Sequence, residues 1–125
     1  MTDQLLYNTH WRERFLGHPK EFPERYEADS LARDAPNLRR PLLLTHGLAD
    51  DNVYPANTLR LSHALLAAGR PHEVLLLPGI GHQAMQAPIT GGLLSQQAQF
   101  LHRHLARVAP YAGQSPGSNE PHAAG

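Results

Sequence analysis

Two short apolar runs stand out along the chain, and neither shows the alternation of a half-exposed strand. Leu42 to Leu44 form the first run, and residues 74–77 form the second. Continuous apolar runs of this length are typical of strands that are covered on both faces in a parallel sheet. The pattern therefore predicts buried strands over residues 41–46 and 73–77.

The segment after each run has the spacing of an amphipathic helix. Residues 57–68 repeat apolar side chains on one helical face, and Gly69 and Pro71 follow where helices commonly end. Residues 90–108 repeat apolar side chains at intervals of four and three, which predicts a second helix with a buried stripe. The members of that stripe are Leu94, Ala98, Leu101, Leu105 and Val108. The pattern thus predicts the order strand, helix, strand, helix.

The N-terminal part of the chain is rich in aromatic and charged side chains and shows little strand alternation. Tyr7 and Trp11 lie one helical turn apart, which predicts a short helix over about residues 8–16. A further turn of helix is predicted over residues 23–28, where a proline opens the segment. Residues 30–40 have the composition of a connecting loop or a brief turn.

The order of these elements predicts where polar side chains meet. A right-handed crossover makes the two strands parallel and brings the loops after them to the same edge of the sheet. Asp50 and Asp51 lie in the first of these loops, and His82 lies in the second. Either carboxylate can meet the imidazole, and the pattern does not choose between them. Two strands leave edges in need of partners, so we expect the chain to be the end of a larger domain.

Composition narrows the functional classes. A chain of 125 residues is at most one domain, and its 11 basic and 11 acidic residues balance, which argues against binding to nucleic acid or an anionic membrane. The absence of cysteine excludes thiolate metal sites. His102 and His104 are two residues apart, unlike the i, i+4 pairing of helical metal ligands, so no metal or other cofactor is expected. The sequence carries no pattern of a signal peptide or of a membrane-spanning segment, and it does not indicate the cellular compartment of the protein.

An acid after one strand and a histidine after the next match the end of the Ser, Asp, His order of α/β-hydrolases. In that arrangement the carboxylate accepts the imidazole N–H and stabilises the imidazolium that forms when the histidine takes the serine proton. The alternative is structural, because an Asp-Asp-Asn run commonly reverses a chain, and His82 would then be an ordinary loop residue. His46, at a strand end, is expected to be a packed, hydrogen-bonded ring.

Two stretches carry a family resemblance: HGLADDNVYPANTLRLSHALLAAGRPHEVLLLPGIGH and, upstream of it, TDQLLYNTHWRERFLGHPKEFPERYEADS. Both resemble the end of the catalytic domain of the prolyl oligopeptidase family of serine peptidases, particularly its dipeptidyl peptidase IV branch. The resemblance covers about residues 2–108 and implies the C-terminal part of an α/β-hydrolase fold. Residues 1–109 would form part of that catalytic domain. Residues 110–125, rich in Pro, Gly, Ser and Ala, are expected to be disordered.

The resemblance implies roles for six residues. Asp50 would be the acid of the catalytic triad and His82 its base, while Asn52 would bind the carbonyl of the substrate's second residue. The wall of the pocket for a proline or alanine side chain would consist of Tyr7, Trp11 and Val53. The alternative for Tyr7 and Trp11 is a structural role, in which they form a helical stripe that faces the core. The sequence departs from the branch at two positions, where Gln4 replaces a usual Trp and Gln83 a usual Gly.

The nucleophile of the family is absent from this sequence. A nucleophile elbow has the pattern G-x-S-x-G, and none of the five serines lies in one. These serines are Ser30, Ser62, Ser95, Ser115 and Ser118. The resemblance places the elbow, the oxyanion donors and the substrate-gating propeller before Met1, so this chain alone is expected to be inactive.

For the complete enzyme, the resemblance implies a peptide substrate with proline or alanine second from its N-terminus. The expected partners are the N-terminal half and, in the complete enzyme, a second copy. Two other functions stay open: an esterase or acylaminoacyl peptidase on the same fold, and a non-catalytic remnant or interaction piece.

Overall fold

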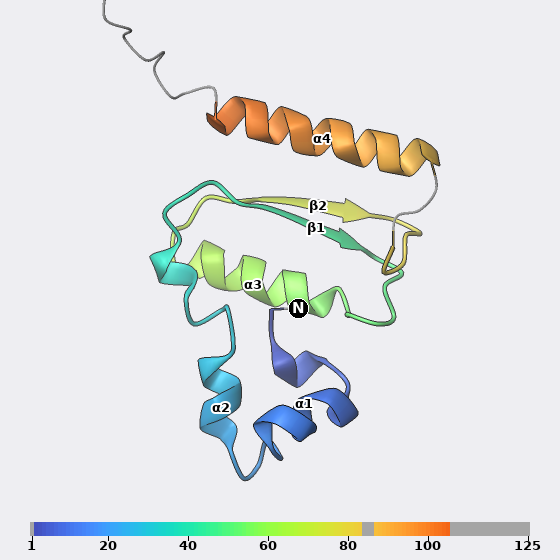
Figure 1. The fold of residues 1–125 in the computed structure, drawn as a ribbon. Coiled ribbons are helices and arrows are strands. Elements are labelled where there is room, and N and C mark those ends of the chain that lie inside the picture. The colour runs from blue at the N-terminus through green and yellow to red at the C-terminus, as the bar shows by residue number, and fades with distance from the viewer. Residues whose placement is uncertain (1, 84–86, 106–125) are drawn as a thin grey trace, which may run out of the picture.

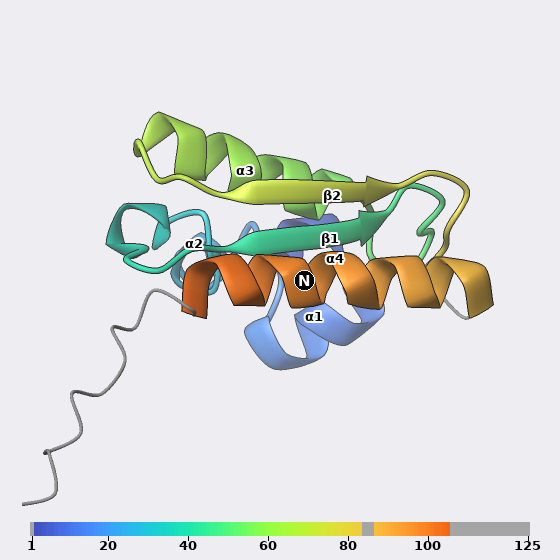
Figure 2. The same ribbon diagram turned by 90° about the horizontal axis from the view of Figure 1, so that it is seen from above.

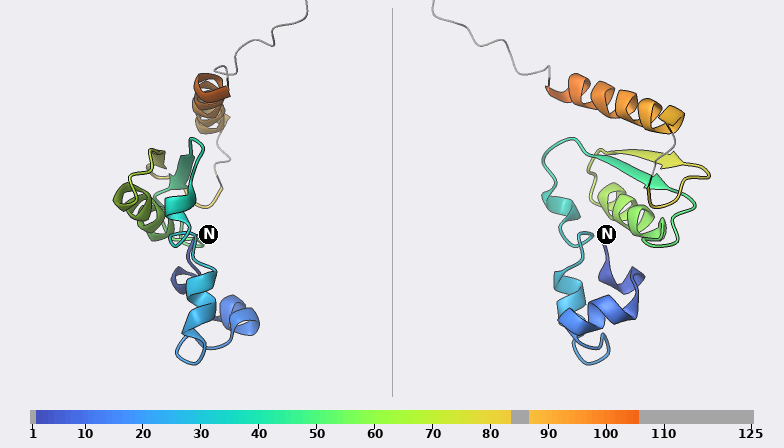
Figure 3. Two further views of the ribbon diagram at one scale, coloured as in Figure 1. Left: turned by 90° about the vertical axis from the view of Figure 1, so that its left-hand side faces the viewer. Right: turned by 45° about the vertical axis from the view of Figure 1, so that its right-hand side comes forward.

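The computed structural model describes residues 2–83 and 87–105, and its centre is a pair of parallel strands (Figure 1). Strand β1 (Leu43–Gly47) pairs with β2 (Glu73–Leu77), with Leu43 opposite Glu73 and Gly47 opposite Leu77. Helix α3 (Ala56–Ala67) connects the strands, and α4 (Ala87–Leu105) follows β2. Figures 1 and 3 show α3 and α4 on opposite sides of the strand pair. The predicted strand, helix, strand, helix order is confirmed.

The N-terminal part lies beyond α3, on the side away from α4 (Figure 1). Its elements are α1 (Thr9–Leu16), α2 (Pro23–Ala28) and two 3-10 helices, Gln4–Leu6 and Ala35–Asn37. The amide oxygen of Asn57, a residue that is 1% exposed, accepts hydrogen bonds from the backbone N–H groups of Thr2 and Asp3. Asp3 also forms an ion pair with Arg60, with 2.8 Å between the charged atoms. These contacts attach the start of the chain to α3.

The element boundaries agree with the sequence pattern to within a few residues. Helix α2 has the predicted bounds, while β1 begins two residues later than predicted, after Pro41, which has no N–H to donate to a strand partner. Helix α4 begins three residues earlier than predicted. Its predicted end at Val108 and the predicted disordered tail over 110–125 lie outside the described residues. The 3-10 helix near the N-terminus was not predicted.

The buried stripe predicted for α4 is wrong. Leu94, Leu101 and Leu105 are each more than half exposed, and Phe100 is the buried side chain of this helix. Figures 1 and 2 show α4 running alongside the strand pair. Because the same helix also carries Leu93 and Phe100 on another face, it has two apolar faces, and spacing alone did not show which of them meets the sheet.

The core lies between α3 and the strands. Leu61 and Leu65 of α3 are buried together with Ala35, and Leu42 and Leu44 pack against them. The strands were predicted to be fully buried, but most of their residues are only half-buried, and Val74 is exposed. The physical reason is the size of the sheet, because each described strand has only one neighbour. Within residues 2–83 and 87–105, no helix has the length and apolar character needed to cross a membrane.

Gly47, the last residue of β1, brings the two strand-end loops into contact. The backbone N–H of Leu48 donates to Leu77 at 3.0 Å, and that of Ala49 donates to Ile80 at 2.9 Å. A side chain on Gly47 would collide with the backbone of Ile80 and Gly81. The absence of a Cβ therefore lets the loop after β1 lie directly against the loop after β2.

Gly47→Ala is expected to lower the free energy of unfolding by about 2 kcal/mol or more, because backbone atoms cannot move aside as a flexible side chain can. Gly91→Ala is the matched control, since a Cβ there meets nothing within 4 Å and alanine favours a helix by up to about 1 kcal/mol. Urea denaturation of both variants measures the two effects. Equal free energies of unfolding for the variants would contradict this account of the loop contact.

Candidate active site

A carboxylate and an imidazole meet at the edge of the sheet where both strands end. Asp50 Oδ2 lies 3.0 Å from His82 Nδ1. Because a carboxylate only accepts, Nδ1 carries the hydrogen and donates it, which leaves Nε2 as the acceptor of a neutral ring. Asp50 is 7% exposed, whereas about half of the His82 side chain is open to solvent. The pair thus combines a buried acid with an accessible base.

The structure also decides between the two adjacent acids. Asp50 faces His82, while Asp51 is exposed and lines a separate surface hollow with Asn52 and Tyr54. The residue pattern had left this choice open. The geometry thus places the first acid of the two beside the histidine.

The other carboxylate oxygen of Asp50 holds the loop. Oδ1 accepts hydrogen bonds from the backbone N–H of Asn52 at 2.9 Å and of Val53 at 2.8 Å. This is the turn chemistry expected of an Asp-Asp-Asn run. The turn interpretation and the acid–base interpretation therefore describe two oxygens of one side chain and do not compete.

Opposing effects act on the pKa of Asp50. Burial raises the pKa, because it disfavours the charged form. The hydrogen bond from His82, the backbone N–H groups of Val53 and Asn52 and the charge of His82 all lower it. The lowering effects prevail, so the pKa of Asp50 lies below its ordinary value. Asp50 is consequently ionised at neutral pH and able to stabilise a protonated His82.

The remaining candidate residues fall into neighbouring hollows. Val53 lines a hollow of about 350 Å³ with Asp50 and His82. The Tyr7 hydroxyl lies 3.5 Å from Asn52 Oδ1, so these two residues are adjacent. Trp11 lines a different hollow with Tyr7, and the structure brings neither of them into the hollow of Val53.

Trp11 does not belong to a core-facing stripe. It is 53% exposed and stacks on Phe15, with ring centroids 5.6 Å apart. Gln4, one of the two departures from the resemblance, lines the same hollow as Tyr7 and Trp11. Gln83, the other departure, is exposed next to His82.

Two polar residues beside the pair extend the site: Thr58 is buried, and the His46 side chain is 10% exposed. His46, expected from the sequence to be a packed and hydrogen-bonded ring, is confirmed as one: it contacts Thr58 Oγ1 and the Val53 carbonyl. Its Nε2 also lies 3.4 Å from Asp50 Oδ2, which the pattern did not predict. The sequence gives no sign of the role of Thr58, because a threonine in a helix carries no signal of its tertiary contacts.

The described residues offer acid–base groups rather than a metal centre. Across residues 2–83 and 87–105, no three histidine, aspartate or glutamate side chains are grouped as ligands of a metal ion. What the site can do is hold a carboxylate against one imidazole nitrogen while the other nitrogen takes or gives a proton.

Comparison with known proteins identifies the family. The model of the prolyl oligopeptidase family, Peptidase_S9, matches residues 1–107. The chain belongs to the prolyl oligopeptidase family. This match covers both stretches that carry the resemblance and all six candidate site residues.

Relatives in this family bear the names of dipeptidyl peptidases. Dipeptidyl peptidase 8 of Homo sapiens is 34% identical over 90 residues, which is 70% of this chain but 10% of the relative. A probable dipeptidyl-aminopeptidase B of Fusarium vanettenii is 33% identical over 84 residues, 66% of this chain and 9% of the relative. The chain thus spans about a tenth of the length of these curated relatives.

A solved structure supports the same assignment. The crystal structure of Porphyromonas gingivalis dipeptidyl peptidase 4 matches with a TM-score of 0.78 and 30% identity, over 82% of this chain and 15% of that chain. Together with the parallel strand pair and its flanking helices, this likeness confirms the predicted fold class, part of an α/β-hydrolase fold.

The depressed pKa of Asp50 predicts a pH dependence of stability. A folded-state pKa below the ordinary value of 3.8 stabilises the fold above that value, and this stabilisation is lost as pH falls through the folded-state pKa. Asp50→Asn should therefore remove this part of the pH dependence between about pH 5 and pH 2. Asp51→Asn, at an exposed position, should keep it. Urea denaturation across this range measures the difference, and identical pH profiles for the two variants would contradict the prediction.

Proposed function

We propose that this chain supplies the acid and base of a serine peptidase of the dipeptidyl peptidase type. The observation that carries the proposal is the 3.0 Å contact between Asp50 Oδ2 and His82 Nδ1 at the edge of the parallel strands. Membership of the prolyl oligopeptidase family and relatives named dipeptidyl peptidases support the same chemistry. In this proposal, His82 Nε2 takes the proton of a serine hydroxyl, and Asp50 stabilises the imidazolium.

The nucleophile in this proposal comes from another segment. Ser62 hydrogen-bonds His72 rather than His82, at 2.7 Å, and Ser115 and Ser118 lie outside the described residues. No serine of the sequence lies in a G-x-S-x-G elbow. A preceding part of a catalytic domain would supply the serine and the oxyanion donors, and this chain would be inactive without it.

The proposed substrate is a peptide with proline or alanine second from its N-terminus. Asn52, exposed beside the Tyr7 hydroxyl, is the proposed partner of the carbonyl of that second residue. Val53, half-buried beside Asp50, is the proposed apolar wall of the pocket, with Tyr7 and Trp11 further along. Neither Tyr7 nor Trp11 lines the hollow of Val53, and Tyr7 is linked to the site by the 3.5 Å contact of its hydroxyl with Asn52 Oδ1.

A chimeric peptidase tests the proposed roles of Asp50 and His82. The matching segment of Porphyromonas gingivalis dipeptidyl peptidase 4 is replaced by residues 2–105 of this chain, and cleavage of a chromogenic dipeptide with proline second is measured. We expect activity, a loss of about 10⁴-fold in kcat for Asp50→Asn, and a comparable loss for His82→Ala. Asp51→Asn, exposed beside Asp50, is the matched control and should keep kcat within about threefold of the parent chimera.

Reaction of the same proteins with a fluorophosphonate probe separates the alternatives. The chimera should be labelled, and the 125-residue chain should not. Labelling of the chain at one of its own serines would refute the assignment of the nucleophile to another segment. A folded chimera that cleaves simple esters and not dipeptides would favour an esterase, and a folded chimera that cleaves neither would favour a non-catalytic role.

Asn52→Ala tests the substrate-binding role in the chimera. Loss of one hydrogen bond to the carbonyl of the second residue should cost about 1 kcal/mol of transition-state stabilisation. The value of kcat/KM for the dipeptide should therefore fall roughly fivefold. Hydrolysis of a small ester without that carbonyl should be unchanged. Tyr7→Phe removes only the 3.5 Å contact with Asn52 and is the milder comparison. An equal effect of Asn52→Ala on both substrates would argue against the assigned contact.

A further inference from the structure

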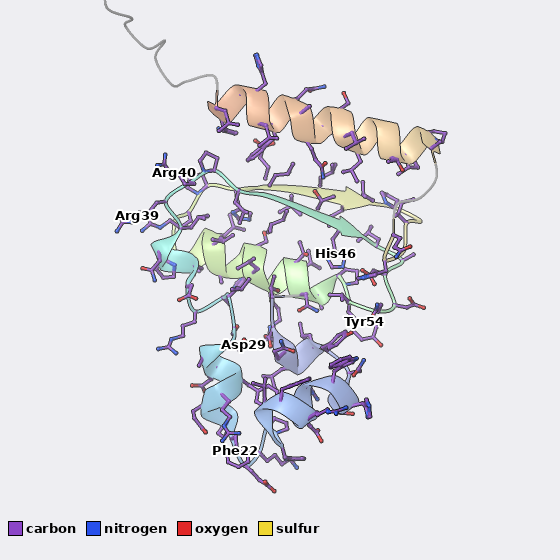
Figure 4. The ribbon with its side chains drawn as sticks, in the orientation of Figure 1. Phe22, Asp29, Arg39, Arg40, His46 and Tyr54 are labelled. Carbon is purple, nitrogen blue, oxygen red and sulfur yellow. The ribbon has the colours of Figure 1, made fainter. Side chains whose placement is uncertain are left out.

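His46 lies between the strand and the helix that flank the acid loop, β1 and α3. Its side chain is 10% exposed, and Figure 4 shows it in the space between β1 and α3. The ring contacts three partners: Thr58 Oγ1 at 2.6 Å, the Val53 carbonyl oxygen at 2.7 Å and Asp50 Oδ2 at 3.4 Å. Both ring nitrogens are therefore engaged.

The Val53 carbonyl determines which nitrogen of the neutral ring carries the hydrogen. A carbonyl oxygen only accepts, so Nε2 of His46 is the donor in this contact. Nδ1 is then the acceptor of the neutral ring and takes the hydrogen of the Thr58 hydroxyl. The ring thereby ties the end of β1 to the last part of the acid loop and to the first turns of α3.

The Val53 peptide connects His46 to the Asp50 carboxylate. Its carbonyl accepts from His46, while its own N–H donates to Asp50 Oδ1 at 2.8 Å. Oδ1 is thus held by a peptide that His46 anchors, and Oδ2 lies between two imidazoles, His82 at 3.0 Å and His46 at 3.4 Å. Rotation of the carboxylate about its Cβ–Cγ bond would break contacts at both oxygens.

We propose that His46 is a positioning residue that holds the Asp50 carboxylate toward His82, through the Val53 peptide and through the contact of Nε2 with Oδ2. This inference rests on the proposed function, in which Asp50 is the acid partner of the base. A ring that merely filled space would need no donor at Nε2. The proposed role depends on that donor, so it can be tested separately from the space that the ring fills.

Two conservative variants separate the donor from the ring. The amide nitrogen of glutamine can take the place of Nε2, whereas that of asparagine reaches only the place of Nδ1. We expect His46→Asn to raise the pKa of Asp50 toward its ordinary value, because the carboxylate loses its anchored peptide and a nearby donor. His46→Gln should keep the pKa low. Titration of the side-chain carboxyl carbon of Asp50 by NMR, on the isotope-labelled 125-residue chain, measures both.

His72→Ala is the matched control, because His72 also has both ring nitrogens in hydrogen bonds, to Ser62 Oγ and to the Arg70 carbonyl. Its removal should leave the pKa of Asp50 unchanged. An unchanged pKa in His46→Asn, an equal rise in His46→Gln, or a rise in His72→Ala would each overturn the proposal.

The unaltered chain gives an independent readout. Nitrogen-15 NMR of the His46 ring, at a pH where the ring is neutral, should show the hydrogen on Nε2. A hydrogen on Nδ1 or rapid exchange between the two nitrogens would overturn the proposal even where His46→Asn unfolds. These measurements need no peptidase activity. A chimera without activity would therefore count against the proposed function alone, and a failure of the NMR result would count against His46 alone.

Discussion

The contact between the two loops that leave the parallel strands is the constraint on which the site depends. Gly47 lies against the backbone of Ile80 and Gly81, and the Ala49 N–H closes the contact with a hydrogen bond to Ile80. Parallel pairing places both strand ends at one edge, but only this close approach brings the following loops within reach of each other. Asp50 and His82 are three residues or fewer from these contact points, so their separation is set mainly by backbone packing.

Asp50 both stabilises the loop and contacts His82, because its two carboxylate oxygens have different partners. One oxygen closes the turn at Asn52 and Val53, and the other faces His82. The turn fixes the carboxylate at a cost in desolvation that the hydrogen bonds offset, and the pKa of Asp50 falls below its ordinary value as a result. In the proposed function, a preorganised acceptor of this kind would need little rearrangement when a positive charge develops on His82.

The apolar surface left on the chain is consistent with membership of a family whose relatives are far longer. The strands are half-buried, and Leu94, Leu101 and Leu105 of α4 are exposed, whereas relatives such as dipeptidyl peptidase 8 match over only a tenth of their length. Parallel sheets usually have several strands with helices over both faces. The described residues have the two helical layers but only two strands between them.

Sequence by itself determined the local structure, the parallel topology and the presence of acids and a histidine at one edge. Apolar runs, helical spacing and the crossover rule depend on nearby residues, and they predicted β1, α3, β2 and α4 with small errors at the ends. The family resemblance singled out Asp50, which the residue pattern alone could not separate from Asp51. Tertiary structure decided the geometry: which carboxylate faces His82, which face of α4 meets the strands, and how His46 is bonded. Those features depend on contacts between residues far apart in the chain, and periodicity within a segment carries no information about such contacts.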